Sequence, residues 1–184
     1  MDSIWGKLFN PSPKKRAQGV LKSIPMFSDM SGRELSLLQS IMHTRKYQAD
    51  EVIFNQGAMG AGMYIIVQGS VHIVMEPTGT VIAELGEGDF FGEIALLDES
   101  PRSATAVAKN FSIVLGFFQP DLFSLAERNP KLGMKVVMRL ARIIGHRLVL
   151  SNAQNHTLKM EVEALKAASS QAAQQPQQAE DKRV

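Results

Sequence analysis

Two oppositely charged side chains at a fixed spacing are the residues of this sequence best suited to hold an anion. In the stretch "FFGEIALLDESPRSATA", Glu93 follows Gly92, and Arg102 follows Pro101 later in the same stretch. The planar guanidinium of arginine can hold two oxygens of a phosphate or carboxylate group, and the adjacent Ser103 adds a hydroxyl donor. The combination predicts a cradle for a phosphate group.

The segment between the two charges is expected to form a short helical turn. Gly92 permits a backbone turn that a side chain would forbid, and the amides of residues 94–97 would point back toward it and attract an anion. Glu93 is unsuited to a bare phosphate but can accept a hydrogen bond from a sugar hydroxyl, so a ribose phosphate satisfies both charges. The alternative is a salt bridge between Glu93 and Arg102 beside a turn.

A β-rich middle section must position these residues. Between Val52 and Phe118, short runs rich in Ile, Val, Tyr and Phe are separated by glycines, which is typical of an antiparallel barrel or jelly roll. The clearest strands are "VIFNQG", "MYIIVQGSVHIVM" and "TVIAELGEG". Gly69 and Ser70 predict a hairpin turn between two of these strands.

Helical patterns flank this section. Apolar residues recur at spacings of three and four from Val20 to Met42, and Ser31 with Glu34 predicts a capping box that starts a helix near Gly32. From Pro130 to Ala168 no proline or strand pattern interrupts the helical period, so a long helix is expected there.

The predicted fold is α+β and mainly β: a double-stranded β-helix, or jelly-roll, barrel with N-terminal helices and a long C-terminal helix. The chain is expected to divide into an N-terminal extension with a short amphipathic segment (1–19), the jelly roll with its flanking helices (20–129), a long lid and dimerisation helix (130–168), and a disordered tail (169–184). The tail is expected to be disordered because it has almost nothing apolar to bury.

Composition narrows the class of protein. Twenty basic and eighteen acidic residues give a net charge of +2, which is too balanced to indicate nucleic acid or an anionic membrane as partner. The absence of cysteine excludes disulfides and thiolate chemistry and fits a reducing compartment. No apolar run approaches the ~20 residues of a membrane span. A soluble, cytoplasmic protein is therefore expected.

The N-terminal residues leave two interpretations open. An apolar group at helical spacing precedes a basic trio: Ile4, Trp5, Leu8 and Phe9, then Lys14, Lys15 and Arg16. Residues 4–16 suit docking on a membrane surface or a partner, or a short amphipathic turn that packs on its own domain.

Catalysis is not expected. A metal-dependent jelly-roll enzyme needs clustered histidines and carboxylates on adjacent strands, whereas the histidines here are scattered over helices and one strand: His43, His72, His146 and His156. We therefore expect no metal, no cofactor and no catalytic residue. DNA binding is not expected either, because no helix-turn-helix domain follows the long helix.

The stretch "FGEIALLDESPRSATA", residues 91–106 and hereafter the cassette, resembles the phosphate-binding cassette of the cyclic-nucleotide-binding domain family. That family includes effector domains of the catabolite-activator type, and this chain is closest in character to the domains of bacterial cyclic-nucleotide-regulated channels. The resemblance runs from about Met26 to the terminal helix, and "GMYIIVQGSVHIV" is similar to the family's strand and glycine hairpin. One departure is "GAMGAG", Gly57 to Gly62, where many relatives carry acidic residues.

The resemblance implies roles for residues of the cassette. Glu93 would accept the ribose 2′-hydroxyl, and Arg102 would pair with the cyclic phosphate. Arg102→Ala is expected to leave the ligand-free fold intact, because a largely solvated guanidinium contributes little to it. The remaining cassette residues of the site would be Phe91, Gly92, Ile94, Ala95, Ser103 and Ala104. The purine would lie against Ile73 and Ile82, and its cap would be either His146 and Arg147 or Ser151 and Asn152, depending on a one-turn shift of the alignment.

These expectations combine into a stand-alone cyclic-nucleotide sensor that relays its signal through the C-terminal helix to an unidentified downstream protein. The ligand would be cAMP in preference to cGMP, because serine and alanine follow Arg102 where cGMP-binding relatives often have threonine. An apolar stripe predicts a coiled-coil seam and a parallel homodimer: Val137, Ala141, Ile144, Leu148, Ser151, Asn155, Leu158, Val162 and Leu165. The alternative is an interaction module whose cassette binds a cyclic dinucleotide or is silent.

Overall fold

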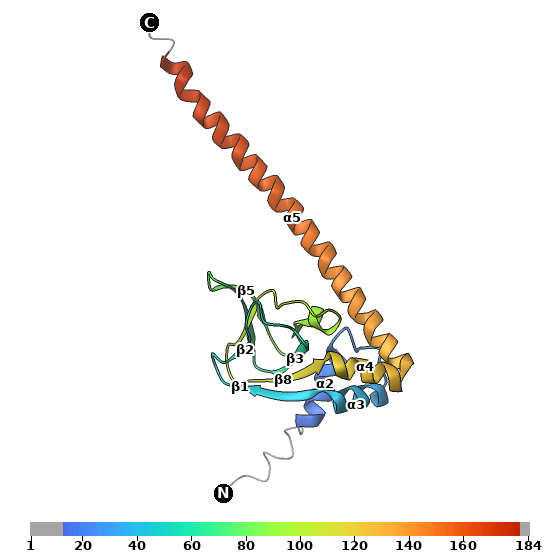
Figure 1. Ribbon diagram of the computed structural model, residues 1–184. Helices are drawn as coiled ribbons and strands as arrows, with labels where there is room; N and C mark the ends of the chain where they lie inside the picture. Colours follow the sequence, from blue (N-terminus) through green and yellow to red (C-terminus); the bar gives the residue numbers. More distant parts are fainter. Residues whose placement is uncertain (1–12, 181–184) are drawn as a thin grey trace. The chain divides into compact units, whose positions relative to one another are not determined.

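The computed structural model describes residues 13–180, and a barrel of two antiparallel sheets forms their middle part (Figure 1). Within these residues eight strands form two four-stranded sheets, with strand orders β1-β8-β3-β6 and β2-β7-β4-β5. The strands are β1 (His43–Tyr47), β2 (Val52–Phe54), β3 (Gly62–Gln68), β4 (Val71–Met75), β5 (Thr80–Leu85), β6 (Phe90–Phe91), β7 (Thr105–Ala108) and β8 (Ser112–Phe118). The predicted jelly roll is confirmed.

The core of the barrel lies between the two sheets. Ile66, Phe91 and Val114 come from one sheet, and Val71 and Ala106 come from the other. All five are buried, and full burial of a side chain as large as valine, isoleucine or phenylalanine contributes about 1.5–3 kcal/mol, whereas Ala106 contributes less. The β-branched and aromatic residues of the strands therefore form the core that holds the two sheets together.

The turn at Gly69 and Ser70 connects the two sheets instead of closing a hairpin. Gly69 has a φ of +88°, so the sharp turn was predicted correctly. The hairpin was wrong, because β3 pairs with β6 and β8 while β4 pairs with β5 and β7. The backbone of Ser70 is held by donation to Asn110 Oδ1 at 3.0 Å and by acceptance from Ser112 Oγ at 3.1 Å. This corner moves the chain from one sheet to the other.

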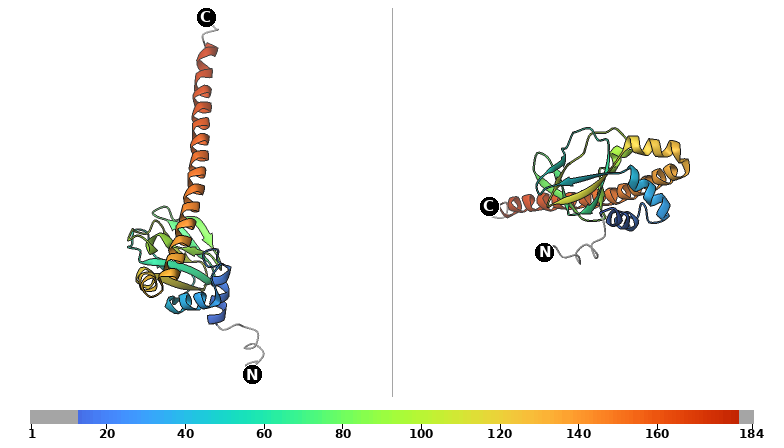
Figure 2. Two further views of the ribbon diagram at one scale, coloured as in Figure 1. Left: turned by 90° about the vertical axis from the view of Figure 1, so that its right-hand side faces the viewer. Right: turned by 90° about the horizontal axis from the view of Figure 1, so that it is seen from below.

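Three helices gather on one side of the barrel (Figures 1 and 2). They are α2 (Pro13–Ser23), α3 (Gly32–Ile41) and α4 (Gln119–Arg128), with α2 packed on α3 and β3, and α4 on β8. The predicted start of α3 is confirmed: Ser31 Oγ accepts from the Glu34 amide at 3.3 Å, and the Glu34 carboxylate accepts from the Ser31 amide at 2.7 Å. Both ends of this capping box satisfy amides that the helix leaves unpaired.

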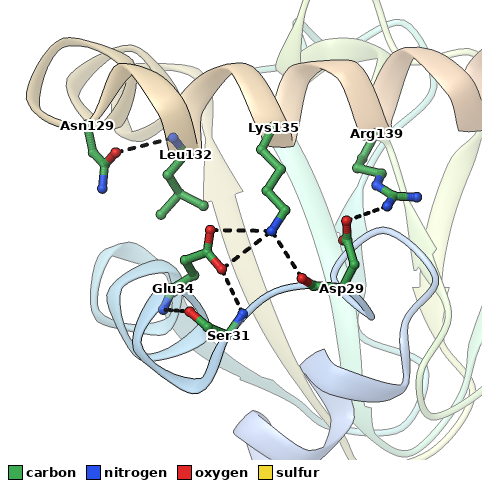
Figure 3. Close-up of polar contacts among 7 residues, drawn as sticks. All are labelled: Asp29, Ser31, Glu34, Asn129, Leu132, Lys135 and Arg139. Carbon is green, nitrogen blue, oxygen red and sulfur yellow. Dashed lines mark hydrogen bonds and ion pairs between the residues drawn. The ribbon is translucent and has the colours of Figure 1, made fainter.

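The first turns of α5 (Pro130–Glu180) are fastened to the segment that leads into α3 (Figure 3). Lys135 Nζ donates to the Glu34 carboxylate at 3.3 Å and to the Asp29 carbonyl at 3.1 Å, and Arg139 pairs with the Asp29 carboxylate. We call these contacts the basal ion pairs. Beneath them, Leu132, Val136 and Leu140 are buried.

The rest of α5 is longer than the sequence suggests. The helix continues past Ala168, where the sequence analysis ended it and expected disorder, to Glu180. Alanine and glutamine favour helix without burial, which explains the extra length. Of the described residues, 13–140 form one compact unit and 141–180 form another.

The N-terminal docking segment falls mostly outside the described residues, which exclude 1–12. Of its basic trio, the structure describes the Arg16 side chain, which pairs with Glu87 at 2.8 Å and donates to Gln68 at 3.2 Å. Within residues 13–180, no helix combines the length and apolar character required of a membrane span.

Candidate functional site

The second residue of the cassette is a glycine that no other residue can replace without strain. Between β6 and the 3₁₀ helix η1 (Glu93–Leu96), Gly92 adopts a φ of +71° in the left-handed region. A Cβ atom at this position would also collide with Arg102 Nη1. The turn places Glu93 in a buried position, with 7% of its surface exposed, where it interacts electrostatically with Arg102.

Arg102 is buried, which contradicts the expected solvated guanidinium. Only 8% of its surface is exposed. Its Nη1 donates to the Gly92 carbonyl at 2.9 Å, and its Nη2 donates to the Gly62 carbonyl at 2.7 Å. Nε is buried without a hydrogen-bond partner in the described part of the chain. The sequence could not reveal this arrangement, because Gly62 lies on a distant strand.

The loop "GAMGAG" positions Arg102 through its backbone. The Arg102 amide donates to the Ala58 carbonyl at 2.8 Å, and the Gly57 amide donates to the Arg102 carbonyl at 2.8 Å. Gly60 passes so close that a Cβ there would collide with Ala95 and press on the guanidinium. The departure from the family pattern thus lies in the loop's side chains, while its backbone fastens the arginine.

The Arg102 guanidinium stays charged although it is buried. Burial lowers the pKa of Arg102, while Tyr64 and the Glu93 carboxylate act in the opposite direction. Arginine remains a cation under such conditions. Among the described residues, its side-chain hydrogen bonds go to the carbonyl oxygens of Gly62 and Gly92, and Glu93 interacts with it electrostatically, so the alternative of a Glu93–Arg102 salt bridge stays a prediction. The arrangement offers a fixed cation with unused N–H donors beside a buried carboxylate.

Comparison with known proteins places this site in a family. Residues 44–129, which contain the cassette and both sheets, match the model of the cyclic nucleotide-binding domain. These residues belong to the cyclic nucleotide-binding domain family. The predicted resemblance is therefore confirmed.

Relatives of this domain occur in several kinds of protein. The chain is 34% identical over 125 residues to a cyclic AMP receptor protein of Thermus thermophilus, covering 66% of this chain and 58% of that protein. It is 32% identical over 105 residues to a cAMP-dependent protein kinase regulatory subunit of Mycosarcoma maydis, covering 55% of this chain and 20% of the relative. The matched part of the chain thus spans 58% of the first relative's length and 20% of the second's.

Among solved structures, a cyclic nucleotide-binding domain from Methylobacillus flagellatus superimposes with a TM-score of 0.67 and 28% identity. The match covers 77% of this chain and 81% of that one. The two-sheet barrel is thus the fold of the family.

The other predicted cassette residues divide between the core and the surface. Phe91 stacks on Tyr64 with ring centroids 5.5 Å apart and belongs to the core cluster. Ala95 and Ala104 are buried, whereas Ile94 and Ser103 are exposed. The cyclic nucleotide-binding domain therefore brings Gly92, Glu93, Ala95 and Arg102 together and leaves Ser103 facing solvent.

The residues expected to contact or cap the purine remain predictions. Ile73 is half-buried on β4, and Ile82 is 53% exposed at the bulge of β5. The four candidate caps are exposed on α5 within the unit of residues 141–184: His146, Arg147, Ser151 and Asn152. Among the described residues, no three His, Asp or Glu side chains are grouped as a metal site requires.

Sequence reasoning missed the aromatic residues beneath the arginine. The Arg102 guanidinium lies 4.1 Å from the ring centroid of Phe54 and 5.8 Å from that of Tyr64. Both rings lie in strands that the sequence identified, "VIFNQG" and "MYIIVQG". The available signal was the alternation of side chains in those strands, which gives each ring a defined face.

Proposed function

We propose that this chain is a regulatory protein that binds cAMP in its cassette and catalyses no reaction. The observation that carries the proposal is the fixed Arg102 cation, whose buried Nε donor has no partner within residues 13–180, close to the buried Glu93 carboxylate. A cyclic phosphate would supply acceptors for the guanidinium, and a ribose hydroxyl would donate to Glu93. A bare phosphate would meet repulsion from Glu93.

The remaining contacts follow from this placement. Ala95, Ser103 and Ala104 would border the phosphate, and Ile73 and Ile82 would contact the purine. The printed names of two relatives, a cyclic AMP receptor protein and a cAMP-dependent protein kinase regulatory subunit, favour cAMP over cGMP as the ligand. We propose a cytoplasmic location for this sensor.

Signal relay would use the distal part of α5. Its stripe residues Leu158, Val162 and Leu165 are 57%, 48% and 71% exposed, and a second copy of the helix would cover them in a parallel homodimer. Ser151 and Asn155 are polar members of the stripe and would set its register. Ligand binding would bias the arrangement of the two helices, which a downstream protein would read.

The proposal is tested by calorimetric titration with cAMP, cGMP, 5′-AMP and a cyclic dinucleotide at one salt concentration. It predicts saturable binding of one cAMP per chain, weaker binding of cGMP and little binding of 5′-AMP. Binding of the cyclic dinucleotide alone, or of none of the four, would reject it in favour of the alternative module.

A further inference from the structure

Arg102 occupies a slot in which its side-chain hydrogen bonds, among the described residues, go to backbone carbonyls, and the Glu93 carboxylate acts on the guanidinium electrostatically. One side of the slot is the Phe54 ring, whose centroid lies 4.1 Å from the guanidinium carbon. The other sides are backbone: the carbonyls of Gly62 and Gly92 accept from the two terminal nitrogens, and Gly60 passes close to the guanidinium. The loop that borders the slot, residues 57–62, contains glycine, alanine and methionine only.

An aromatic ring and a carboxylate leave different numbers of guanidinium donors free for a ligand. A guanidinium carries five N–H donors along its edge, and a carboxylate partner would occupy two of them and neutralise the charge. A ring attracts the cation through its face and leaves the edge donors and the charge available. The two carbonyls use one donor on each terminal nitrogen, and Nε is unpartnered.

We propose that Phe54 is a positioning residue for ligand binding, which holds the Arg102 guanidinium by its face so that the unused donors on its edge meet the ligand's phosphate. This inference rests on the proposed function and deepens it. Phe54 itself is held by Tyr64 and Phe91, each with a ring centroid 5.8 Å away, so the platform cannot tilt freely. Tyr64 extends the aromatic surface under the same cation.

The first arm of the test needs no ligand. In the NMR spectrum of the ligand-free full chain, the Arg102 side-chain protons should be shifted upfield by the Phe54 ring, with the signals assigned by their loss in Arg102→Lys. Phe54→Leu keeps an apolar side chain and should remove the upfield shift. Phe118→Leu is the matched control, because Phe118 is also half-buried and also contacts Tyr64, at 6.0 Å. It should leave the shift in place.

The second arm measures cAMP affinity by titration. Phe54→Leu should weaken binding about three- to thirtyfold, and Phe54→Tyr, which restores a ring face, should recover most of the affinity. Phe118→Leu should bind as the wild type does. Thermal unfolding of the ligand-free variants identifies the temperature at which all are folded.

The outcomes separate the inference from the proposed function. A missing ring-current shift, or equal losses of affinity in Phe54→Leu and Phe118→Leu, would overturn the positioning role even if cAMP binds the wild type. A wild type that binds no cyclic nucleotide would reject the proposed function and this role with it, and the shift would then report a purely structural stack.

Discussion

Arg102 Nη2 donates a buried 2.7 Å hydrogen bond to the carbonyl oxygen of Gly62. Arg102, which we propose to bind the ligand's phosphate, therefore also contributes to the ligand-free fold. The expectation that Arg102→Ala would leave the ligand-free fold intact is therefore replaced by a different prediction.

Arg102→Ala should destabilise the ligand-free protein by about 1–3 kcal/mol, because the carbonyls of Gly62 and Gly92 lose a charged donor in a buried place. Urea unfolding without ligand measures the change. Arg45→Ala is the control, since Arg45 is exposed on β1 and should alter stability by less than about 0.5 kcal/mol. Equal stabilities of the two variants would show that the buried contacts contribute little.

Ligand should stabilise the wild type and not this variant. At ~100 times its dissociation constant, cAMP should add about 2.7 kcal/mol to the free energy of unfolding of the wild type. Arg102→Ala should lose most of this gain, whereas Arg45→Ala should keep it. Thermal or urea unfolding with and without cAMP checks the prediction, and a full gain in Arg102→Ala would contradict it.

The basal ion pairs should make the protein sensitive to acid (Figure 3). The hydrogen bond from Arg139 lowers the pKa of Asp29, and hydrogen bonds from Ser31 followed by Lys135 lower the pKa of Glu34. A carboxyl group whose pKa is lowered by folding stabilises the fold above the unfolded-state pKa, and this contribution is lost as pH falls through the folded-state value. Stability should therefore fall below about pH 4.

Asp29→Asn and Glu34→Gln should each lower stability at neutral pH and flatten its decline in acid. Urea unfolding of the full chain between neutral pH and pH 3 measures both effects. Glu127→Gln, at an exposed position on α4, is the control and should follow the wild type. If Asp29→Asn and Glu34→Gln keep the wild-type pH profile, the basal ion pairs do not contribute.

The exposed stripe of α5 should determine the oligomeric state. Leu158→Glu combined with Val162→Glu should convert the proposed dimer to a monomer, because two charges would enter the apolar seam. Met160→Glu is the control, since Met160 is 56% exposed but lies off the stripe, and it should remain dimeric. Light scattering at high protein concentration, with and without cAMP, checks this.

Truncation after Leu150 should also give a monomer with weaker cAMP binding. A wild type that is monomeric with and without cAMP would contradict the proposed relay.

Selectivity should depend on the residue after Arg102. Ser103→Ala should lower the affinity for cGMP relative to cAMP by about two- to tenfold, because it removes the hydroxyl that could meet the guanine amino group and one hydrogen bond contributes about 0.5–1.5 kcal/mol. Competition titration of both nucleotides against the variant and the wild type measures the ratio. An unchanged ratio would remove Ser103, which is exposed in the ligand-free structure, from the specificity determinants.

Local features were predictable from the sequence because their causes lie within a few residues. The capping box of Ser31 and Glu34 acts over one helical turn, and the left-handed turn at Gly92 needs only the missing side chain. The cassette was recognisable for the same reason, since its residues are contiguous in the chain.

Features that depend on distant residues were not predictable. Gly69 marks a turn in either a hairpin or a sheet-to-sheet corner, and the pairing of β3 with β8 and of β4 with β7 decides between them. The burial of Arg102 likewise depends on Phe54 and Gly62, far from the cassette in sequence. Long-range packing therefore changed the assignment of Arg102 from a solvated anchor to a buried one.

The most direct test of the central claim is the ratio of the cAMP dissociation constants of Arg102→Lys and the wild type, measured by calorimetry at one salt concentration and at a temperature where both are folded. Lysine keeps the charge but cannot present the planar edge of N–H donors or span the carbonyls of Gly62 and Gly92. We predict that the dissociation constant rises about ten- to hundredfold, as expected for losing charge-assisted hydrogen bonds of about 1.5–3 kcal/mol. Equal dissociation constants for the two proteins would contradict cyclic phosphate binding by Arg102.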